Sequence, residues 1–314
     1  MAIFIKYYLH RYEKESFMKN IARIKDAGFN GVFFSAIKSE NLSNRHLLKI
    51  EFYPISEMIE KAREIELKVG VILQCFHSPQ LWSMDSFSPP INSDSMSYVP
   101  DSWYRPTCPN NPISQERFQK ILEEMSRTVP PDYFYFDFFR FPFFWEQEQL
   151  DIQHKVPPYC YCSSCLTSFS SSIGTTVYSV SQVLEMVPKW VEWRKISILK
   201  WLENAKELLP NASQIIIATP PVSCAQLVFM TGQFPQGLID KGCLISPLLY
   251  HAIKEKNISW VEEMLDRYQV DMKTIEQFPS FQITDKKEFN LIKQWQDRYS
   301  GISFFHWKTF CDLN

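Results

Sequence analysis

Three of the eight cysteines lie close together in the run CYCSSC at positions 160–165. A fourth, Cys108, lies in a proline-containing stretch earlier in the chain. Structural zinc sites take four thiolates at such short spacings and hold them in a tetrahedron. The pattern therefore favours a structural zinc ion bound by Cys108, Cys160, Cys162 and Cys165, with a disulfide or redox role and unrelated thiols as the alternatives. The spacing differs from the cysteine run of iron-sulfur ferredoxins.

Asp137 is the one charged residue in the aromatic stretch YFYFD at positions 133–137. It is in phase with Tyr133 and Tyr135, so the three side chains are expected on the same face of a strand. Burying an unpaired carboxylate there would be costly, which favours a mechanistic or an ion-paired role. Arg140 is the natural partner and would keep Asp137 ionised at neutral pH. A purely structural Asp137–Arg140 pair is the alternative.

Glycoside hydrolysis needs two carboxyl groups beside the glycosidic bond, one to protonate the leaving oxygen and one to act as nucleophile or to activate water. The stretch Met272–Gln277 reads as a strand with Glu276 near its end. Glu276 is therefore the candidate for the second acid, with a salt bridge at the rim as its alternative role.

Other polar and aromatic groups follow similar apolar stretches. Mixed donors and acceptors suit sugar hydroxyls, and aromatic rings stack on the apolar faces of sugars. The predicted substrate-binding residues are Gln74, His77, Arg140, Tyr250, His251, His306 and Trp307, with Trp82, Trp103 and Trp145 as further stacking candidates. Each of them taken alone is also consistent with a structural role.

These residues need a scaffold that gathers the ends of many strands. Short apolar runs alternate with amphipathic stretches, which is the pattern of parallel strands joined by helices. Strands are predicted at Ile3–Tyr8, Gly31–Ile37, Val69–Phe76, Tyr133–Phe139, Gln214–Thr219, Cys243–Tyr250, Met272–Gln277 and Gly301–Trp307. Helices are predicted at Glu15–Ala27, Ile55–Leu67, Gln115–Arg127, Val183–Leu209, Ile258–Tyr268 and Lys286–Asp297. The pattern predicts an α/β fold, a closed (β/α)8 TIM barrel forming a single domain over residues 1–314, with an open doubly wound sheet as the alternative.

Two long loops take up the residues beyond the roughly 250 that such a barrel needs. They are Ser78–Ile113 after the third strand and Phe141–Gln182 after the fourth. Both follow the C-terminal ends of strands, the face on which these barrels place their active sites. The first loop contains Cys108 and the second contains the other three cysteines, so a metal ion bound by all four would cross-link the two loops. Between the fifth and sixth strands, Ala225–Leu238 predicts one poor helix at best.

A cysteine before the fourth strand and a CxCxxC run after it, in an eightfold barrel, resemble the zinc-bearing catalytic barrel of glycoside hydrolase family 42 beta-galactosidases. The stretch FDFFRFP at 136–142 also resembles a motif of related glycosidase-like barrels. The resemblance covers the barrel only. It implies zinc at the four cysteines, Asp137 as the acid/base and Glu276 as the nucleophile; Asp137 as a nucleophile is the second assignment. The chain departs from the family at Phe136–Asp137, where those enzymes have an Asn-Glu pair.

The sequence thus predicts a glycoside hydrolase that cleaves a small glycan or oligosaccharide and has a structural zinc ion as its cofactor. The alternative is a barrel that binds carbohydrate or a protein partner without catalysis. A catalytic metal is disfavoured because four thiolates leave no open coordination position. The resemblance to family 42 also implies self-association as a homo-oligomer.

Composition excludes other classes of protein. The 314 residues are 45% hydrophobic and 22% charged, which suits a large buried core. A formal net charge of -2 provides no general attraction to nucleic acid. With only 8 glycines and neither a GxGxxG nor a GxxxxGK[ST] run, a nucleotide fingerprint is absent. No stretch approaches the roughly 20 apolar residues of a membrane span, so we expect a soluble, cytoplasmic protein without a membrane partner.

Overall fold

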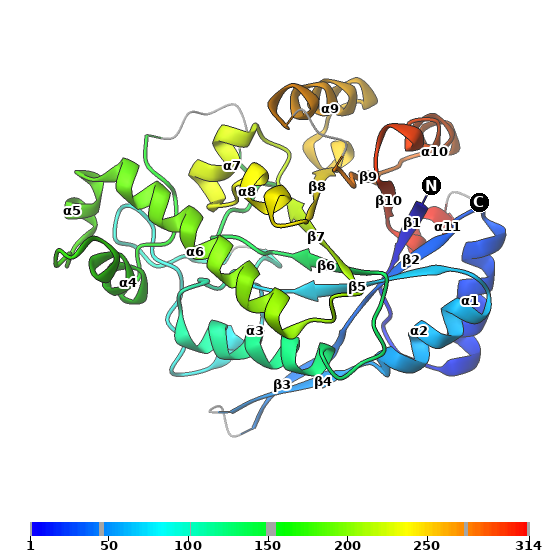
Figure 1. Cartoon of the computed structure of the whole chain (residues 1–314), viewed down its shortest axis with the longest axis horizontal. Coiled ribbons are helices and arrows are strands. Elements are labelled where there is room, and N and C mark those ends of the chain that lie inside the picture. The colour runs from blue at the N-terminus through cyan, green and yellow to red at the C-terminus, as the bar shows by residue number, and fades with distance from the viewer. Residues whose placement is uncertain (1, 44–46, 101, 149–154, 273–275, 313–314) are drawn as a thin grey trace.

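The computed structural model describes residues 2–43, 47–100, 102–148, 155–272 and 276–312, without the side chains of residues 47 and 269–272. In this part of the chain, parallel strands close into an eight-stranded barrel (Figure 1). They are β1 (Ala2–Tyr7), β2 (Gly31–Ser35), β5 (Lys68–Gln74), β6 (Tyr133–Asp137), β7 (Gln214–Thr219), β8 (Leu244–Leu249), β9 (Ser280–Gln282) and β10 (Gly301–Phe305). Each pairs with the next, and β10 pairs with β1. The predicted (β/α)8 barrel is confirmed.

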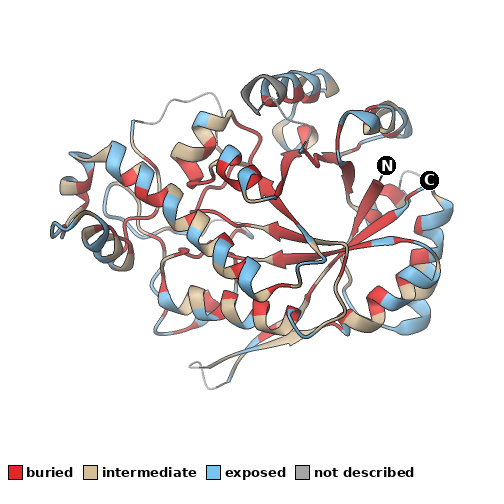
Figure 2. Ribbon diagram, in the orientation of Figure 1, coloured by how far each residue is buried: buried red, intermediate tan, exposed pale blue. Residues whose placement is uncertain are grey.

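Helices cover the outside of the barrel. The larger ones are α1 (Lys14–Asp26), α2 (Ile55–Glu64), α3 (Pro112–Met125), α6 (Val187–Leu208), α9 (Ile258–Met272) and α10 (Lys286–Lys293). Each of the six predicted helices overlaps one of these. In α1 the buried residues Phe17, Ile21 and Ile24 recur at the helical spacing, which is why this stretch forms an amphipathic helix. Figure 2 shows the barrel strands almost wholly buried and the helices exposed on their outer sides.

Shorter helices complete the described chain. They are α4 (Ser163–Ile173), α5 (Val180–Leu184), α7 (Cys224–Thr231), α8 (Pro235–Asp240), α11 (Trp307–Asp312), and the 3₁₀ helices η1 (Leu81–Ser83), η2 (His251–Lys254) and η3 (Gln296–Arg298). The connection from β7 to β8 therefore holds two short helices, where the sequence predicted one poor helix. Within the described residues, every helix is too short or too polar to cross a lipid bilayer.

Aromatic rings fill the barrel interior towards the N-terminal ends of the strands. The rings of Phe4, Phe33 and Phe278 lie within 4.5 to 5.8 Å of one another, centroid to centroid. A Cβ atom at Gly70 would lie 2.0 Å from the Phe33 ring, so only glycine fits there. The lower barrel is thus a packed apolar core, and polar groups concentrate towards the other end.

An antiparallel hairpin follows β2, formed by β3 (Ile37–Ser43) and β4 (Leu47–Phe52), and was not predicted. It extends away from the barrel (Figure 1). The predicted strand Gly31–Ile37 therefore ends earlier, at Ser35.

The predicted seventh strand was wrong in position. Met272 is the last residue of α9, residues 273–275 lie outside the described part, and the strand itself is β9, at Ser280–Gln282. Gln277 lies outside any strand, where it forms an isolated bridge to Ile245 and its carbonyl accepts a hydrogen bond from the N–H of Ser300. At three residues, β9 is too short to show the alternation by which strands are recognised, and Pro279 precedes it directly.

Candidate active site

A cavity of about 620 Å³ opens at the C-terminal ends of the barrel strands. Side chains from or just after β1, β5, β6, β8 and β10 line it. Of the predicted site residues, it brings together Gln74, His77, Asp137, Arg140, Tyr250 and His306, and Trp103 lies at its wall. Residues from five separate parts of the chain therefore meet as the barrel topology predicts.

Asp137 is the last residue of β6 and lies half-buried in the cavity wall. Its Oδ1 accepts a hydrogen bond of 2.9 Å from the backbone N–H of Phe138. Phe138 has a φ of 54°, a left-handed conformation that is unfavourable for a bulky side chain. Burial raises the pKa of Asp137, and the charges of Lys6 and Arg140 oppose that increase.

Lys6, in β1, is buried inside the barrel. Its ammonium donates to the hydroxyls of Tyr135 and Tyr250, at 2.9 and 3.0 Å. These hydroxyls in turn lie 3.0 Å from the hydroxyls of Ser246 and Ser280. Burial lowers the pKa of Lys6 to about 7, although the charge of Asp137 acts in the opposite direction. Two tyrosine hydroxyls, each beside a serine hydroxyl, therefore hold Lys6 in the barrel, and below its pKa of about 7 its positive charge acts on Asp137.

Glu146 is a second carboxyl group in the cavity wall, and the sequence did not predict it. Burial raises its pKa to about 7, against the opposing charge of Arg140. The ammonium of Lys254 holds the neighbouring backbone by donating to the carbonyls of Trp145, Glu146 and Glu148, at 3.3, 3.1 and 2.7 Å. Glu146 lies in a loop rather than at a strand end. The available signal was that it is the first acidic residue after Asp137.

Glu276 lies at the other end of the barrel, contrary to the prediction. Its backbone carbonyl accepts a hydrogen bond of 3.1 Å from the N–H of Ile245, near the start of β8, and its side chain is exposed. Asp137 is at the C-terminal end of its strand, and the strands of the barrel run parallel. The predicted pair of Asp137 and Glu276 is therefore not formed.

Arg140 is 2% exposed, yet it lines the cavity. Its guanidinium carbon lies 5.2 Å from the centre of the Phe138 ring. Within the described chain it makes no ion pair with Asp137, so the alternative of a structural pair finds no support, and its Nε and Nη1 atoms are buried without a hydrogen-bond partner.

The predicted histidines have different surroundings. His77 is buried and stacks on Phe138, with ring centroids 4.6 Å apart; burial lowers its pKa to about 3, so it is neutral. His306 is half-buried, with its Nδ1 atom 2.9 Å from the hydroxyl of Thr309, and burial lowers its pKa as well.

His251 is not among the residues that line the cavity. It is buried on η2, where its Nε2 atom lies 3.1 Å from a carboxylate oxygen of Glu288.

Of the four predicted tryptophans, only Trp103 is among the described residues that line the cavity. Trp103 is 54% exposed at the cavity wall and can offer its face to a sugar ring. Trp307 is buried at the start of α11, and its indole N–H donates to Asn20 of α1 at 3.5 Å, away from the cavity. Trp82 donates to the carbonyl of Pro106 at 3.0 Å, and Trp145 is buried with its ring 6.1 Å from that of Tyr250. These three have structural surroundings in the described chain.

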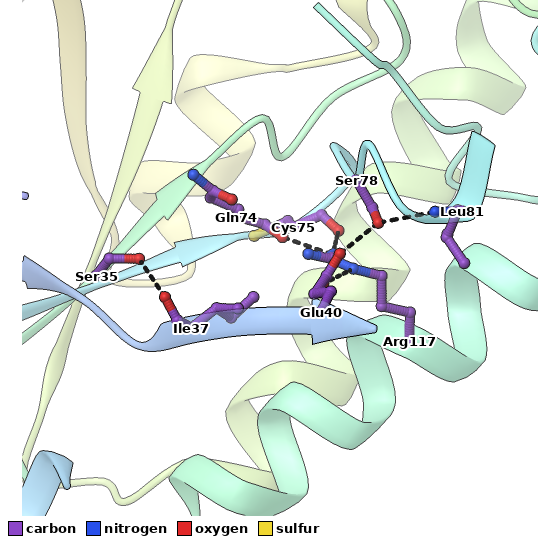
Figure 3. Close-up of polar contacts among 8 residues, drawn as sticks. All are labelled: Ser35, Ile37, Glu40, Gln74, Cys75, Ser78, Leu81 and Arg117. Atoms are coloured by element: carbon purple, nitrogen blue, oxygen red, sulfur yellow. Dashed lines mark hydrogen bonds and ion pairs between the residues drawn. The ribbon is translucent and has the colours of Figure 1, made fainter. Parts of the chain in front are cut away.

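A buried ion pair supports the β5 side of the cavity (Figure 3). Arg117 of α3 donates to Glu40 of β3 at 2.6 Å and to the carbonyls of Gln74 and Cys75 at 2.7 and 2.9 Å. The hydroxyl of Ser78 donates to the other oxygen of Glu40 at 2.5 Å. The hairpin and α3 are thereby joined to the end of β5 and to Cys75, two residues before His77.

The four predicted metal ligands lie together. Cys108, Cys160, Cys162 and Cys165 are all buried, and their Sγ atoms lie within 4.8 Å of one another. None of the four is in a disulfide, and the Sγ atoms of Cys108 and Cys165 are 3.2 Å apart, well beyond a disulfide bond. A tetrahedral zinc ion with bonds of about 2.3 Å would separate its sulfur ligands by about 3.8 Å, so the cluster fits a metal ion.

The surroundings of the cluster suit thiolates. The backbone N–H groups of Ile91 and Asn110 donate to the sulfurs of Cys160 and Cys108, each at 3.4 Å. Cys162 is the N-cap of α4, where the helix dipole favours a negative charge. Four buried cysteines therefore join the loop after β5 to the loop after β6 and could hold a metal ion.

The chain is similar in fold to several glycoside hydrolase structures. The PgaB (BpsB) glycoside hydrolase domain from Bordetella bronchiseptica matches 99% of this chain and 95% of its own, with a TM-score of 0.74 and 9% identity. The catalytic domain of beta-amylase from Paenibacillus polymyxa matches 98% of this chain and 92% of its own, with a TM-score of 0.66 and 10% identity.

A beta-galactosidase from Halorubrum lacusprofundi matches 98% of this chain, with a TM-score of 0.66 and 12% identity, but only 52% of its own chain is covered. No protein-family model and no curated protein matches the sequence. The similarity at this level of identity establishes the fold, a (β/α)8 TIM barrel.

Proposed function

We propose that this protein is a glycoside hydrolase and that Asp137 and Glu146 are its two carboxyl groups. One observation carries the proposal: two carboxyl groups with raised pKa values line the same cavity, at the end of the barrel where such folds place their chemistry. The likeness in fold to three carbohydrate-cleaving enzymes supports it.

Glu146 is the proton donor in this proposal. With a pKa of about 7, it keeps its proton over the acidic and near-neutral range and can deliver it to the leaving glycosidic oxygen. Asp137, influenced by the cations Lys6 and Arg140, is the carboxylate that attacks the anomeric carbon or removes a proton from the attacking water. The deprotonated Glu146 then accepts a proton as the cycle closes.

The rest of the cavity suits a carbohydrate. Trp103 offers a stacking face, and Gln74, Tyr250 and His306 offer polar groups from three different strands or strand ends. A cavity of about 620 Å³ lies within the range of small-ligand sites, which favours a small glycan or the end of an oligosaccharide.

Zinc held by Cys108, Cys160, Cys162 and Cys165 completes the proposal. It would cross-link the two loops, and these loops carry Trp103 and Glu146. With all four positions taken by thiolates, the ion has a structural role and no place for substrate.

The test uses nitrophenyl glycosides of both anomers with wild-type protein and three variants. Asp137→Asn and Glu146→Gln should each lower kcat/KM by about 100-fold or more, because each removes a group that acts in the transition state. Glu276→Gln, a change of the same kind at the opposite end of the barrel, should leave kcat/KM unchanged. Full activity of Asp137→Asn, or loss of activity in Glu276→Gln alone, would reject the assignment.

A further inference from the structure

Arg140 differs from the other two fully buried arginines of the described chain. Arg117 donates to Glu40 and to two backbone carbonyls. Arg194 donates to the carbonyls of Tyr159, Phe229 and Met230, at 2.6 to 3.0 Å. Arg140 is 2% exposed and donates no side-chain hydrogen bond to any described residue.

A buried guanidinium without acceptors is expensive, because it has lost water and gained no partner. Arg117 and Arg194 offset most of that cost with three acceptors each, although one nitrogen of each, Nη2 of Arg117 and Nε of Arg194, is also buried without a partner. Arg140 is instead one of the residues that line the cavity, beside Asp137 and Glu146. Its free donors are therefore placed where a bound ligand can supply the acceptor oxygens.

We infer that the cavity binds a sugar that carries an anionic oxyacid group, a carboxylate or a sulfate, against the guanidinium of Arg140. The inference rests on the proposed function and adds the class of substrate. A guanidinium matches the paired oxygens of such a group better than it matches single hydroxyls, and a charged hydrogen bond in a buried site is stronger than a neutral one.

The other charges around the cavity allow an anion to bind. In the proposed mechanism Glu146 carries its proton when substrate binds, so Asp137 is the one negative charge in the cavity wall. Arg140 is positive, the buried Lys6 is positive below its pKa of about 7, and the ammonium of Lys254 contacts the backbone carbonyl of Glu146. A ligand with one negative charge therefore does not meet an excess of negative charge in this site.

The experiment compares matched methyl glycosides that differ only at one position of the sugar. Methyl glucuronide, methyl glucoside 6-sulfate and neutral methyl glucoside, as both anomers and with the galacto series alongside, are titrated into the full chain by calorimetry. At least one anionic sugar should bind about tenfold or more tighter than its neutral counterpart. Comparing the affinity of methyl glucuronide with that of methyl glucoside 6-sulfate identifies whether a carboxylate or a sulfate is recognised.

Arg140→Gln should abolish this preference, and Arg140→Lys should keep part of it because the charge remains without the planar fork. Arg127→Gln is the matched control: it removes an exposed arginine at the end of α3 and should leave the preference intact. Circular dichroism and melting curves establish that each variant is folded.

Equal or weaker binding of every anionic sugar would overturn the inference, as would a preference that survives in Arg140→Gln. Hydrolysis of neutral glycosides without any preference for acids would overturn it too, and would leave the proposed function standing. Tight binding of an acidic sugar through Arg140, without turnover of any glycoside, would support the inference and count against hydrolysis.

Discussion

The charge on Asp137 depends on Lys6, a buried residue that does not line the cavity. The Lys6 ammonium is held by two tyrosine hydroxyls, and its charge opposes the increase that burial causes in the pKa of Asp137. A cation in the barrel interior thus favours the ionised form of the carboxylate that the mechanism requires.

Lys6→Met should therefore raise the pKa of Asp137 further. Asp137 must be ionised to act, so the acidic limb of the pH profile of kcat/KM should move to higher pH. The profile of Lys68→Met, which removes an exposed lysine at the start of β5, is the control. An acidic limb that moves equally in both variants would contradict a specific effect of Lys6.

Glu146 should set the alkaline limb of the same profile. Its pKa is about 7, and the proton donor must be protonated, so kcat/KM should fall as pH rises through about 7. The residual activity of Glu146→Gln should lack this limb, because an amide does not titrate. A wild-type profile that stays flat to about pH 9 would exclude Glu146 as the acid.

Among individual residues, the sequence predicted several cavity residues at or just after strand ends, but it did not predict Glu146, which lies in a loop. Asp137, His77 and His306 follow recognisable strands, and a parallel barrel brings such positions together. Glu146 is positioned by the path of its loop and by Lys254, which is remote in the sequence. The prediction that Glu276 lies in the active site was wrong because the seventh strand begins at Ser280, after Glu276. Glu276 therefore lies at the N-terminal end of the barrel, opposite the cavity.

Among the elements, the β3–β4 hairpin is joined to the barrel by the ion pair of Glu40 and Arg117, which is almost completely buried. Breaking a buried pair leaves the remaining charge without compensation. Here that charge would be Arg117, which also holds the carbonyls at the end of β5.

Glu40→Ala should lower the free energy of unfolding by about 3 to 5 kcal/mol, measured by urea denaturation. Glu51→Ala, on the same hairpin, removes a carboxylate paired at 3.6 Å with the exposed Lys38 and Lys49, and should leave stability nearly unchanged. Equal effects of the two substitutions would show that the buried pair has no special contribution.

Elements with strong local patterns were predictable. β2, β5 and β7 are continuous apolar runs, and the buried stripe of α1 recurs at helical spacing. β9 was not predictable because it is three residues long and follows Pro279. The hairpin contacts the rest of the molecule through the pair of Glu40 with Arg117 and through Leu42 and Leu48, which pack on the cluster of Leu81, Met84 and Phe87. These partners are far away in the sequence, so no local pattern reveals them.

Over the whole molecule, the four cysteines connect two loops that leave neighbouring strands and form part of the cavity wall. The sequence predicted both the barrel and this cluster, because the strand order fixes which loops are neighbours. The orientation of individual cavity side chains depends on packing between loops and could not be predicted in the same way.

Purified, reduced protein should contain about one zinc ion per chain, measured by elemental analysis. Cys162→Ser should lose the metal and make the loops at 78–113 and 141–182 more sensitive to protease, because the cross-link is broken. Cys311→Ser changes a half-buried thiol outside the cluster and should keep both the metal and the protease resistance. A metal content near zero in undamaged wild-type protein would contradict the zinc assignment.

The exposed indole of Trp103 provides an intrinsic fluorescence signal that reports on the cavity. It is 54% exposed at the cavity wall, so an occupant that covers it would shift its emission to shorter wavelength and shield it from a dissolved quencher such as acrylamide. Trp145 and Trp190 are already fully buried and would change little. Occupancy of the barrel mouth can thus be followed by fluorescence with unlabelled protein, before any reaction is known.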